Sequence, residues 1–118
     1  MLLTRGETLI VNGYDVYPGA SLAGSILSNV DLKGADLSGV DFTGADLSNA
    51  YMSGVNLTDA NLTEAKLIGT YLYGANLTRA NLRGANLKNA NLKNANMHGA
   101  ILLDANLPYE YRKFSYRK

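Results

Sequence analysis

The residues best suited to chemistry in this 118-residue sequence are a series of aspartates and a single histidine. Asp31, Asp36, Asp41 and Asp46 follow one another at intervals of five residues, and His98 is the only imidazole in the chain. Carboxylates that converge can exchange protons with a substrate or hold a divalent cation, and a histidine can act as a base at neutral pH. Whether such chemistry is available therefore depends on the elements that position these side chains.

The composition excludes some classes of function. The chain has no cysteine, which removes disulfides, thiolate nucleophiles and cysteine metal sites. Its net charge of +1 gives no overall argument for a nucleic-acid or membrane partner. The N-terminus lacks a basic leader with a long apolar run, and no stretch approaches about 18 apolar residues. We therefore expect one small cytoplasmic domain that does not associate with membranes.

A period of five residues runs through most of the chain. From Leu22 to Leu107 all eighteen fifth positions are large and apolar, with Phe42, Met52 and Met97 the only departures from leucine. A small residue precedes each of them by two positions and is alanine in thirteen cases. The position between is Asp or Asn in twelve repeats. The pattern thus separates a large, a small and a polar position in every repeat.

A five-residue period fits neither a continuous helix, around which the leucines would scatter, nor a continuous strand, on which they would alternate between the two faces. A three-residue extended segment followed by a two-residue turn fits, since the small and large residues then share the inner face. Gly or Asn stands at thirteen of the seventeen corners from residue 24 to residue 104, as a type II turn with positive φ prefers. We expect turns of another type at the four exceptions, Asp59, Glu64, Arg79 and Asp104.

The repeat A-[DN]-L-x-[GN], as in GADLSGVDFTGADLSNA and TRANLRGANLKNANLKNANMHGA, resembles the pentapeptide-repeat family over residues 20–109. The resemblance implies an all-β fold, a right-handed four-sided β-helix or solenoid with four repeats per coil. Eighteen repeats then make about 4.5 coils. We divide the chain into an N-terminal cap (1–19), the pentapeptide-repeat solenoid (20–107) and a basic, aromatic C-terminal tail or cap (108–118).

Both termini leave the repeat and are expected to cap the exposed ends of the solenoid. Residues 8–17 place Asn12-Gly13 between apolar runs, a pattern that predicts a hairpin. Pro108 should end the ladder at the other end. Three outward apolar residues are expected to be covered by the nearer terminus: Ile26, Ile101 and Leu103.

The four-sided fold that the resemblance implies argues against an enzyme. The aspartates would point from different faces, and His98 would occupy an outward corner in place of the common Ser or Thr. The sequence contains no recognisable pair of nucleophile and base, and its glycines follow the turns rather than forming a phosphate loop. We predict no catalytic, cofactor-binding or metal-binding residues and no small-molecule substrate.

With the vertical spacing of twenty residues that the resemblance implies, Tyr51 and Tyr71 fall above one another on one face. Tyr73 lies beside Tyr71, and Ile68 lies just before the adjoining corner. Two interpretations are open for this candidate interaction face. The tyrosines are a structural cross-strand ladder, or they form a surface for a protein partner or a second copy of the chain.

Charge is segregated along the chain. Residues 21–70 sum to −4, whereas residues 71–107 and the tail each sum to +3. The segregation is either a solvated surface of drifting repeats or a basis for head-to-tail association. The candidate basic surface consists of Arg79, Arg83, Lys88, Lys93, Arg112 and Lys113.

Three functions remain open. The favoured hypothesis is a structural or protein-interaction module with an unidentified macromolecular partner, which is how many short, cyanobacterial members of the family are described. The first alternative, also suggested by the resemblance, is a DNA mimic that binds a type II topoisomerase and protects it from quinolones, although this chain lacks the strong negative charge of such proteins. The second alternative is nucleic-acid binding through the basic C-terminal part, which we do not expect because the rod residues point from different sides.

Overall fold

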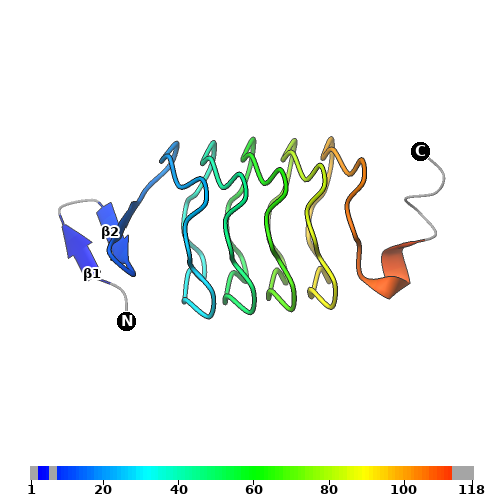
Figure 1. The fold of residues 1–118 in the computed structure, drawn as a ribbon, viewed down its shortest axis with the longest axis horizontal. Coiled ribbons are helices and arrows are strands. Elements are labelled where there is room, and N and C mark those ends of the chain that lie inside the picture. The colour runs from blue at the N-terminus through cyan, green and yellow to red at the C-terminus, as the bar shows by residue number, and fades with distance from the viewer. Residues whose placement is uncertain (1–2, 6–7, 113–118) are drawn as a thin grey trace.

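The computed structural model describes residues 3–5 and 8–112 and shows an elongated molecule with extents of 45 × 23 × 21 Å. A small antiparallel sheet at the N-terminal end contains β1 (Leu3–Arg5), β2 (Thr8–Val11) and β3 (Tyr14–Val16), in that order. A stack of coils follows it, and a 3-10 helix, η1 (Tyr109–Tyr111), lies beyond the last coil (Figure 1). The molecule is therefore a β-solenoid with a distinct element at each end.

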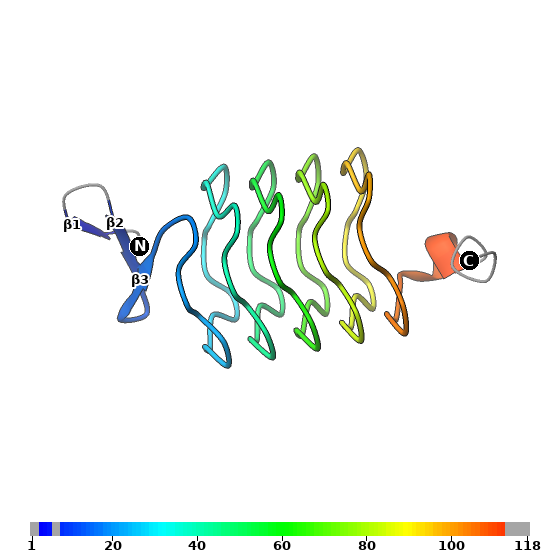
Figure 2. The same ribbon diagram turned by 90° about the horizontal axis from the view of Figure 1, so that it is seen from above.

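Parallel bridges between residues twenty positions apart join the coils, beginning with Ser21 and Asp41. Because the repeat is five residues long, this register places four repeats in each coil. The backbone N–H of Leu22 donates to the carbonyl of Asp41 at 2.8 Å, and the Asp41 N–H donates to the carbonyl of Ala20 at 2.9 Å. Figure 2 shows the resulting coils stacked side by side along the long axis. Each coil thus supplies the hydrogen-bond partners of its neighbours.

The inward residues form one continuous apolar column. The leucines of the central coils are fully buried, and Phe42 and Met52 fill the same positions without exposure. Two inward small positions are polar. Thr70 donates its hydroxyl to the carbonyl of Leu47 at 2.7 Å, whereas the buried hydroxyl of Ser25 has no partner among the described residues.

Positive φ values occur at every predicted Gly and Asn corner and also at the four exceptions. The φ values of Asp59, Glu64, Arg79 and Asp104 lie between 56° and 62°. The expectation of a different turn type at these residues is therefore wrong. At Asp59, Glu64 and Arg79 the bonds between coils impose the turn, since each backbone N–H donates to the next coil, as from Asp59 to the Thr78 carbonyl at 2.9 Å. These bonds outweigh the cost of about 1–2 kcal/mol of a left-handed conformation in a residue with a Cβ.

The predicted hairpin is present. Strands β2 and β3 pair in antiparallel fashion around Asn12 and Gly13, which both have positive φ, 51° and 82°. Its turn lies over the first coil, because the Asn12 amide donates to the carbonyl of Ile26 and the Ile26 N–H donates to the hydroxyl of Tyr14 at 3.2 Å. The third strand, β1, was not predicted, since its three residues are too few to show a pattern.

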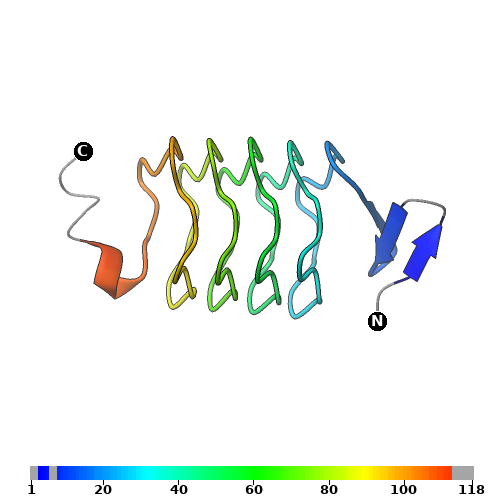
Figure 3. The same cartoon turned by 180° about the vertical axis from the view of Figure 1, so that it is seen from behind.

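The outward apolar residues at the two ends are not covered. The side chains of Ile26, Ile101 and Leu103 are 63%, 49% and 57% exposed, so the expectation that the termini bury them is wrong. The hairpin is hydrogen-bonded to the backbone of Ile26. The helix η1 lies beyond the last coil (Figure 3), where Tyr111 packs against the apolar core but leaves Ile101 and Leu103 exposed. The residues of the tail beyond Arg112 lie outside the described part of the chain.

Candidate interaction face

Tyr51 and Tyr71 occupy the same ladder of outward positions on neighbouring coils. They form a parallel bridge, and their ring centroids lie 5.0 Å apart with an angle of 3° between the ring planes. This separation follows from the spacing of about 4.8 Å between paired strands, so the coil register itself produces the stack. The side chains remain 46% and 44% exposed. The stack therefore presents ring edges and hydroxyl groups to solvent.

Tyr73 widens the aromatic surface at the next corner. Its side chain is 46% exposed, and its hydroxyl accepts a hydrogen bond from the Asn94 amide at 3.1 Å. Ile68, on the preceding corner, is only partly exposed and lies at the margin. We refer to Tyr51, Tyr71 and Tyr73 together as the tyrosine face.

A hollow of about 350 Å³ opens beside Tyr51 at the N-terminal end of the tyrosine face. One wall is the β2–β3 hairpin with Val11 and Asn12, and the other includes Asp31 and Lys33 of the first full coil. Asp31 is the bridge partner of Tyr51, so the carboxylate lies one coil from the ring. The sequence did not reveal this hollow, because it depends on how the hairpin packs against the coils.

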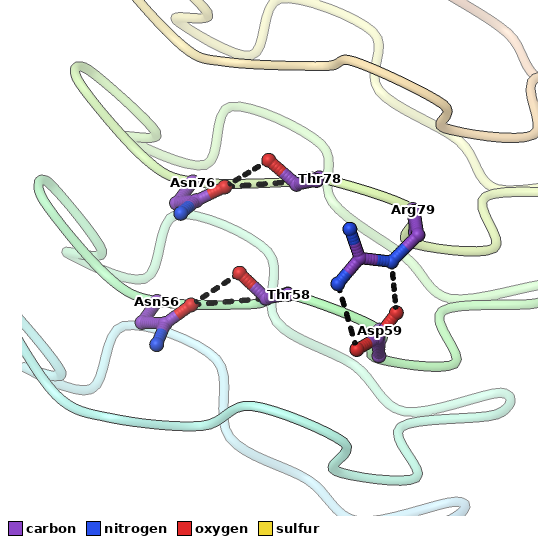
Figure 4. A network of polar contacts seen from close by, with 6 residues as sticks. All are labelled: Asn56, Thr58, Asp59, Asn76, Thr78 and Arg79. Atoms are coloured by element: carbon purple, nitrogen blue, oxygen red, sulfur yellow. Dashed lines mark hydrogen bonds and ion pairs between the residues drawn. The ribbon is translucent and has the colours of Figure 1, made fainter.

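The outward aspartates and asparagines cap the turns that follow them. The Oδ1 of Asn56 accepts the backbone N–H of Thr58 at 3.1 Å, and that of Asn76 accepts the N–H of Thr78 at 3.0 Å (Figure 4). Both threonine hydroxyls donate to the same oxygens. The four aspartates accept the corresponding N–H groups in the same way. We did not predict this Asx-turn role, although Asp or Asn two residues before Ser or Thr was a visible signal.

The four aspartates of one coil each lie in a different column of bridged residues: Asp31, Asp36, Asp41 and Asp46. Their bridge partners twenty residues later are not acidic. Negative charge at these positions therefore encircles the solenoid instead of running along it, and the carboxylates do not converge. His98 is exposed at a corner, and its backbone N–H donates to Asn96 at 3.0 Å. No group of three metal-ligating side chains is close enough to hold an ion in the part of the chain that the structure describes.

Asp59 and Arg79 form a two-pronged ion pair across neighbouring coils. The Arg79 Nε and Nη2 atoms donate to the two carboxylate oxygens at 2.8 and 3.1 Å (Figure 4). The hydrogen bond from Arg79 lowers the pKa of Asp59, and the carboxylate in turn raises the pKa of Arg79. Both side chains are more than half exposed, so the pair adds little to stability. Arg79 is nevertheless already engaged by a partner within the chain.

The candidate basic residues of the coils lie on four separate corners: Arg79, Arg83, Lys88 and Lys93. Arg112 follows η1, donates to the carbonyl of Leu107 at 3.3 Å and lies 5.8 Å from the centre of the Tyr109 ring. Lys113 lies outside the described residues. The structure therefore does not bring the described members of this set into one stripe.

The twenty-residue register, the inward column and the capped turns define a repeat protein of the β-solenoid class. The family model for pentapeptide repeats matches the chain with eight copies, over residues 19–54, 41–79 and 75–108. The chain belongs to the pentapeptide-repeat family.

Solved structures of other pentapeptide repeat proteins are similar to this chain. A pentapeptide repeat protein from the Arabidopsis thaliana thylakoid lumen is 31% identical, with a TM-score of 0.75 over 86% of this chain and 72% of that one. A pentapeptide repeat protein from Nostoc PCC 7120 is 34% identical, with a TM-score of 0.51 over 75% of this chain and 80% of that one. The fluoroquinolone resistance protein QnrB1 is only 19% identical, with a TM-score of 0.31 over 75% of this chain and 66% of that one, and carries no argument about function. No curated protein matches this chain.

Within residues 3–5 and 8–112, no helix has the length and apolar character needed to cross a membrane. The Arabidopsis protein comes from the thylakoid lumen. A cytoplasmic location for this chain therefore stays a prediction.

Proposed function

We propose that this chain is a non-enzymatic interaction module that binds a protein partner through the tyrosine face. The observation that carries the proposal is the exposed Tyr51–Tyr71 stack with Tyr73 beside it. Three large aromatic side chains, each close to half exposed, lie together in a fold whose leucines are almost all buried. Exposed aromatic clusters are typical of binding surfaces, because tyrosine combines apolar area with a hydroxyl and loses little side-chain entropy on binding.

The solenoid supports this role by holding the face rigid. Each tyrosine is bound through its backbone to the preceding coil: the Tyr51 N–H donates to the carbonyl of Val30, and the N–H groups of Met52 and Gly54 donate to the carbonyls of Tyr71 and Tyr73. We take the solenoid to have the right-handed turn and about 4.5 coils that the resemblance implies. The outward Asp and Asn side chains cap turns. Among the exposed large apolar side chains, the three tyrosines lie together on the middle coils, whereas Ile26, Ile101 and Leu103 lie near the ends.

The test is a pull-down from lysate with the intact chain and with a Tyr51→Ser, Tyr71→Ser, Tyr73→Ser variant. An Arg79→Ser, Arg83→Ser variant is the basic control, because both residues lie on corners other than those of Tyr73 and Ile68. We expect a partner that the intact chain and the control variant capture and that the tyrosine variant loses, while all three proteins keep their mass in solution and melting temperature. Equal capture by the tyrosine variant would refute the proposal.

The two alternatives predict other outcomes in the same experiment. A DNA mimic needs a continuous negative stripe, whereas the aspartates at 31, 36, 41 and 46 encircle one level. Capture of a topoisomerase would nevertheless establish that alternative. Loss of nucleic acid in the basic variant alone would establish nucleic-acid binding. A change of mass in the tyrosine variant would identify the partner as a second copy of the chain.

A further inference from the structure

We infer that the hollow beside Tyr51 is a socket for one arginine side chain, which the protein partner presents next to the tyrosine face. The inference deepens the proposed function and rests on it. The hollow of about 350 Å³ is large enough to admit one long side chain. Two independent features of its walls select the chemistry of that side chain.

The first feature is a free aromatic ring face. Tyr71 covers one face of the Tyr51 ring in the parallel stack. The opposite face is turned along the ladder toward Asp31, and Tyr51 lines the hollow. A flat group that enters the hollow can therefore continue the stack as its next layer. A planar cation is attracted to such a face by the quadrupole of the ring.

The second feature is a carboxylate without a close ionic partner. Asp31 Oδ1 accepts the backbone N–H of Lys33 at 3.1 Å, while the Lys33 Nζ atom lies 4.0 Å from Oδ2, at the limit of an ion pair. Both side chains are about half exposed. Asp31 and Lys33 are the charged residues among those that line the hollow, so a cation that enters it competes with the Lys33 ammonium for the Asp31 carboxylate.

Arginine satisfies both features at once. Its guanidinium is planar, so it stacks on Tyr51 while its edge donates to the Asp31 carboxylate. A lysine ammonium would pair with Asp31 but could not stack as a layer, and a neutral aromatic ring would stack but leave the carboxylate unpaired. Lys33 is the internal competitor for Asp31, and removing its charge should therefore improve binding.

The experiment is a two-dimensional amide NMR titration of the full chain with N-acetyl-arginine amide. The reference probe is N-acetyl-citrulline amide, which has nearly the same shape but no charge. We expect saturable shifts at residues 28–33 and 51 with the arginine probe and binding about fivefold weaker with the citrulline probe.

Two substitutions should change the affinity for the arginine probe in opposite directions. Asp31→Asn should weaken arginine binding about threefold, and Lys33→Gln should tighten it about threefold. Asp36→Asn is the matched control, because it removes a charge at the same level on another ladder and should leave binding unchanged. Asparagine caps the same turns elsewhere in the chain, so both Asp variants should fold.

The inference is overturned if arginine gives no saturable shift at residues 28–33 and 51, if citrulline binds equally well, or if Asp31→Asn and Asp36→Asn behave alike. A failed titration together with a pull-down partner that needs the tyrosines would remove only the arginine socket and leave the proposed function standing. Saturable arginine binding with no tyrosine-dependent partner would remove the proposed function instead.

Discussion

The central coils and the last coil are built from the same repeat, yet they differ in burial. Leu62 and Leu67 are fully buried, whereas Met97, Ala100 and Leu102 of the last coil remain partly exposed. A central coil is covered on both sides, while the last coil has a neighbouring coil on one side only. The core of this protein therefore comes from the stacking of repeats, and identical residues differ in their contribution according to the number of neighbouring coils.

The largest effect is expected from shortening a leucine in each of the two regions. Leu62→Ala should lower the free energy of unfolding by about 3 kcal/mol, because it removes buried methylenes and leaves a cavity between two coils. Leu102→Ala should cost about half as much, since solvent already reaches that side chain. Urea unfolding of both variants measures the difference. Equal losses would show that the last coil is as well covered as the centre.

Replacing an inward alanine by leucine should also destabilise the central coils more than the last coil, here by overpacking instead of by a cavity. Ala60 and Ala100 stand on one ladder, but Ala60 is 1% exposed and Ala100 is partly exposed. Ala60→Leu should overpack the column and cost about 2 kcal/mol, whereas Ala100→Leu should change stability by less than about 0.5 kcal/mol. The melting temperatures of the two variants test this prediction. A large loss in Ala100→Leu would mean that something fills the space beyond the last coil.

A smaller effect concerns the two polar side chains inside the column. The hydroxyl of Ser25 has no partner among the described residues, while Thr70 donates to Leu47. Ser25→Ala should therefore raise the free energy of unfolding by about 1 kcal/mol, and Thr70→Val should lower it by a similar amount. Urea unfolding of both variants gives the two signs. A loss of stability in Ser25→Ala would show that its hydroxyl has a partner after all.

Features that every repeat encodes locally could be predicted from the sequence. The inward column, the positive φ of the Gly and Asn corners and the Asn12-Gly13 hairpin all follow from residue type and spacing. The Tyr51–Tyr71 stack needed one further fact, the register of twenty, which the family resemblance supplied.

Features that depend on neighbouring coils or on packing between elements could not be predicted. The left-handed conformation of Glu64 contradicts its own preference, because bonds to the next coil outweigh that preference. The exposure of Ile101 and the hollow beside Tyr51 depend on how a terminal segment sits against the coils. The repeat pattern does not contain that information. The tyrosines of the candidate site could therefore be predicted from the sequence, but the hollow beside them could not.

The smallest effect concerns acid, and it again distinguishes the two regions. Asp41, which caps a turn in the central coils, accepts the Thr43 hydroxyl at 2.6 Å and the Thr43 N–H at 3.0 Å. The hydroxyl bond is the main cause, and the N–H bond the second, of a pKa below the usual value of 3.8. The corresponding caps of the last coil, such as Asn96, are amides and do not titrate.

A carboxyl group whose pKa is lower in the folded chain than in the unfolded chain stabilises the fold above the unfolded value. That stabilisation is lost as the pH falls through the lowered value. Asp41→Asn should therefore match the parent near pH 7 and lose less stability than the parent between about pH 4 and pH 2. Urea unfolding across that range measures the difference, and Asp31→Asn, at a carboxyl without the hydroxyl bond, is the control. Parallel stability curves for Asp41→Asn and the parent would show that the Thr43 bonds do not favour the ionised carboxyl, and that central and last coils respond to acid alike.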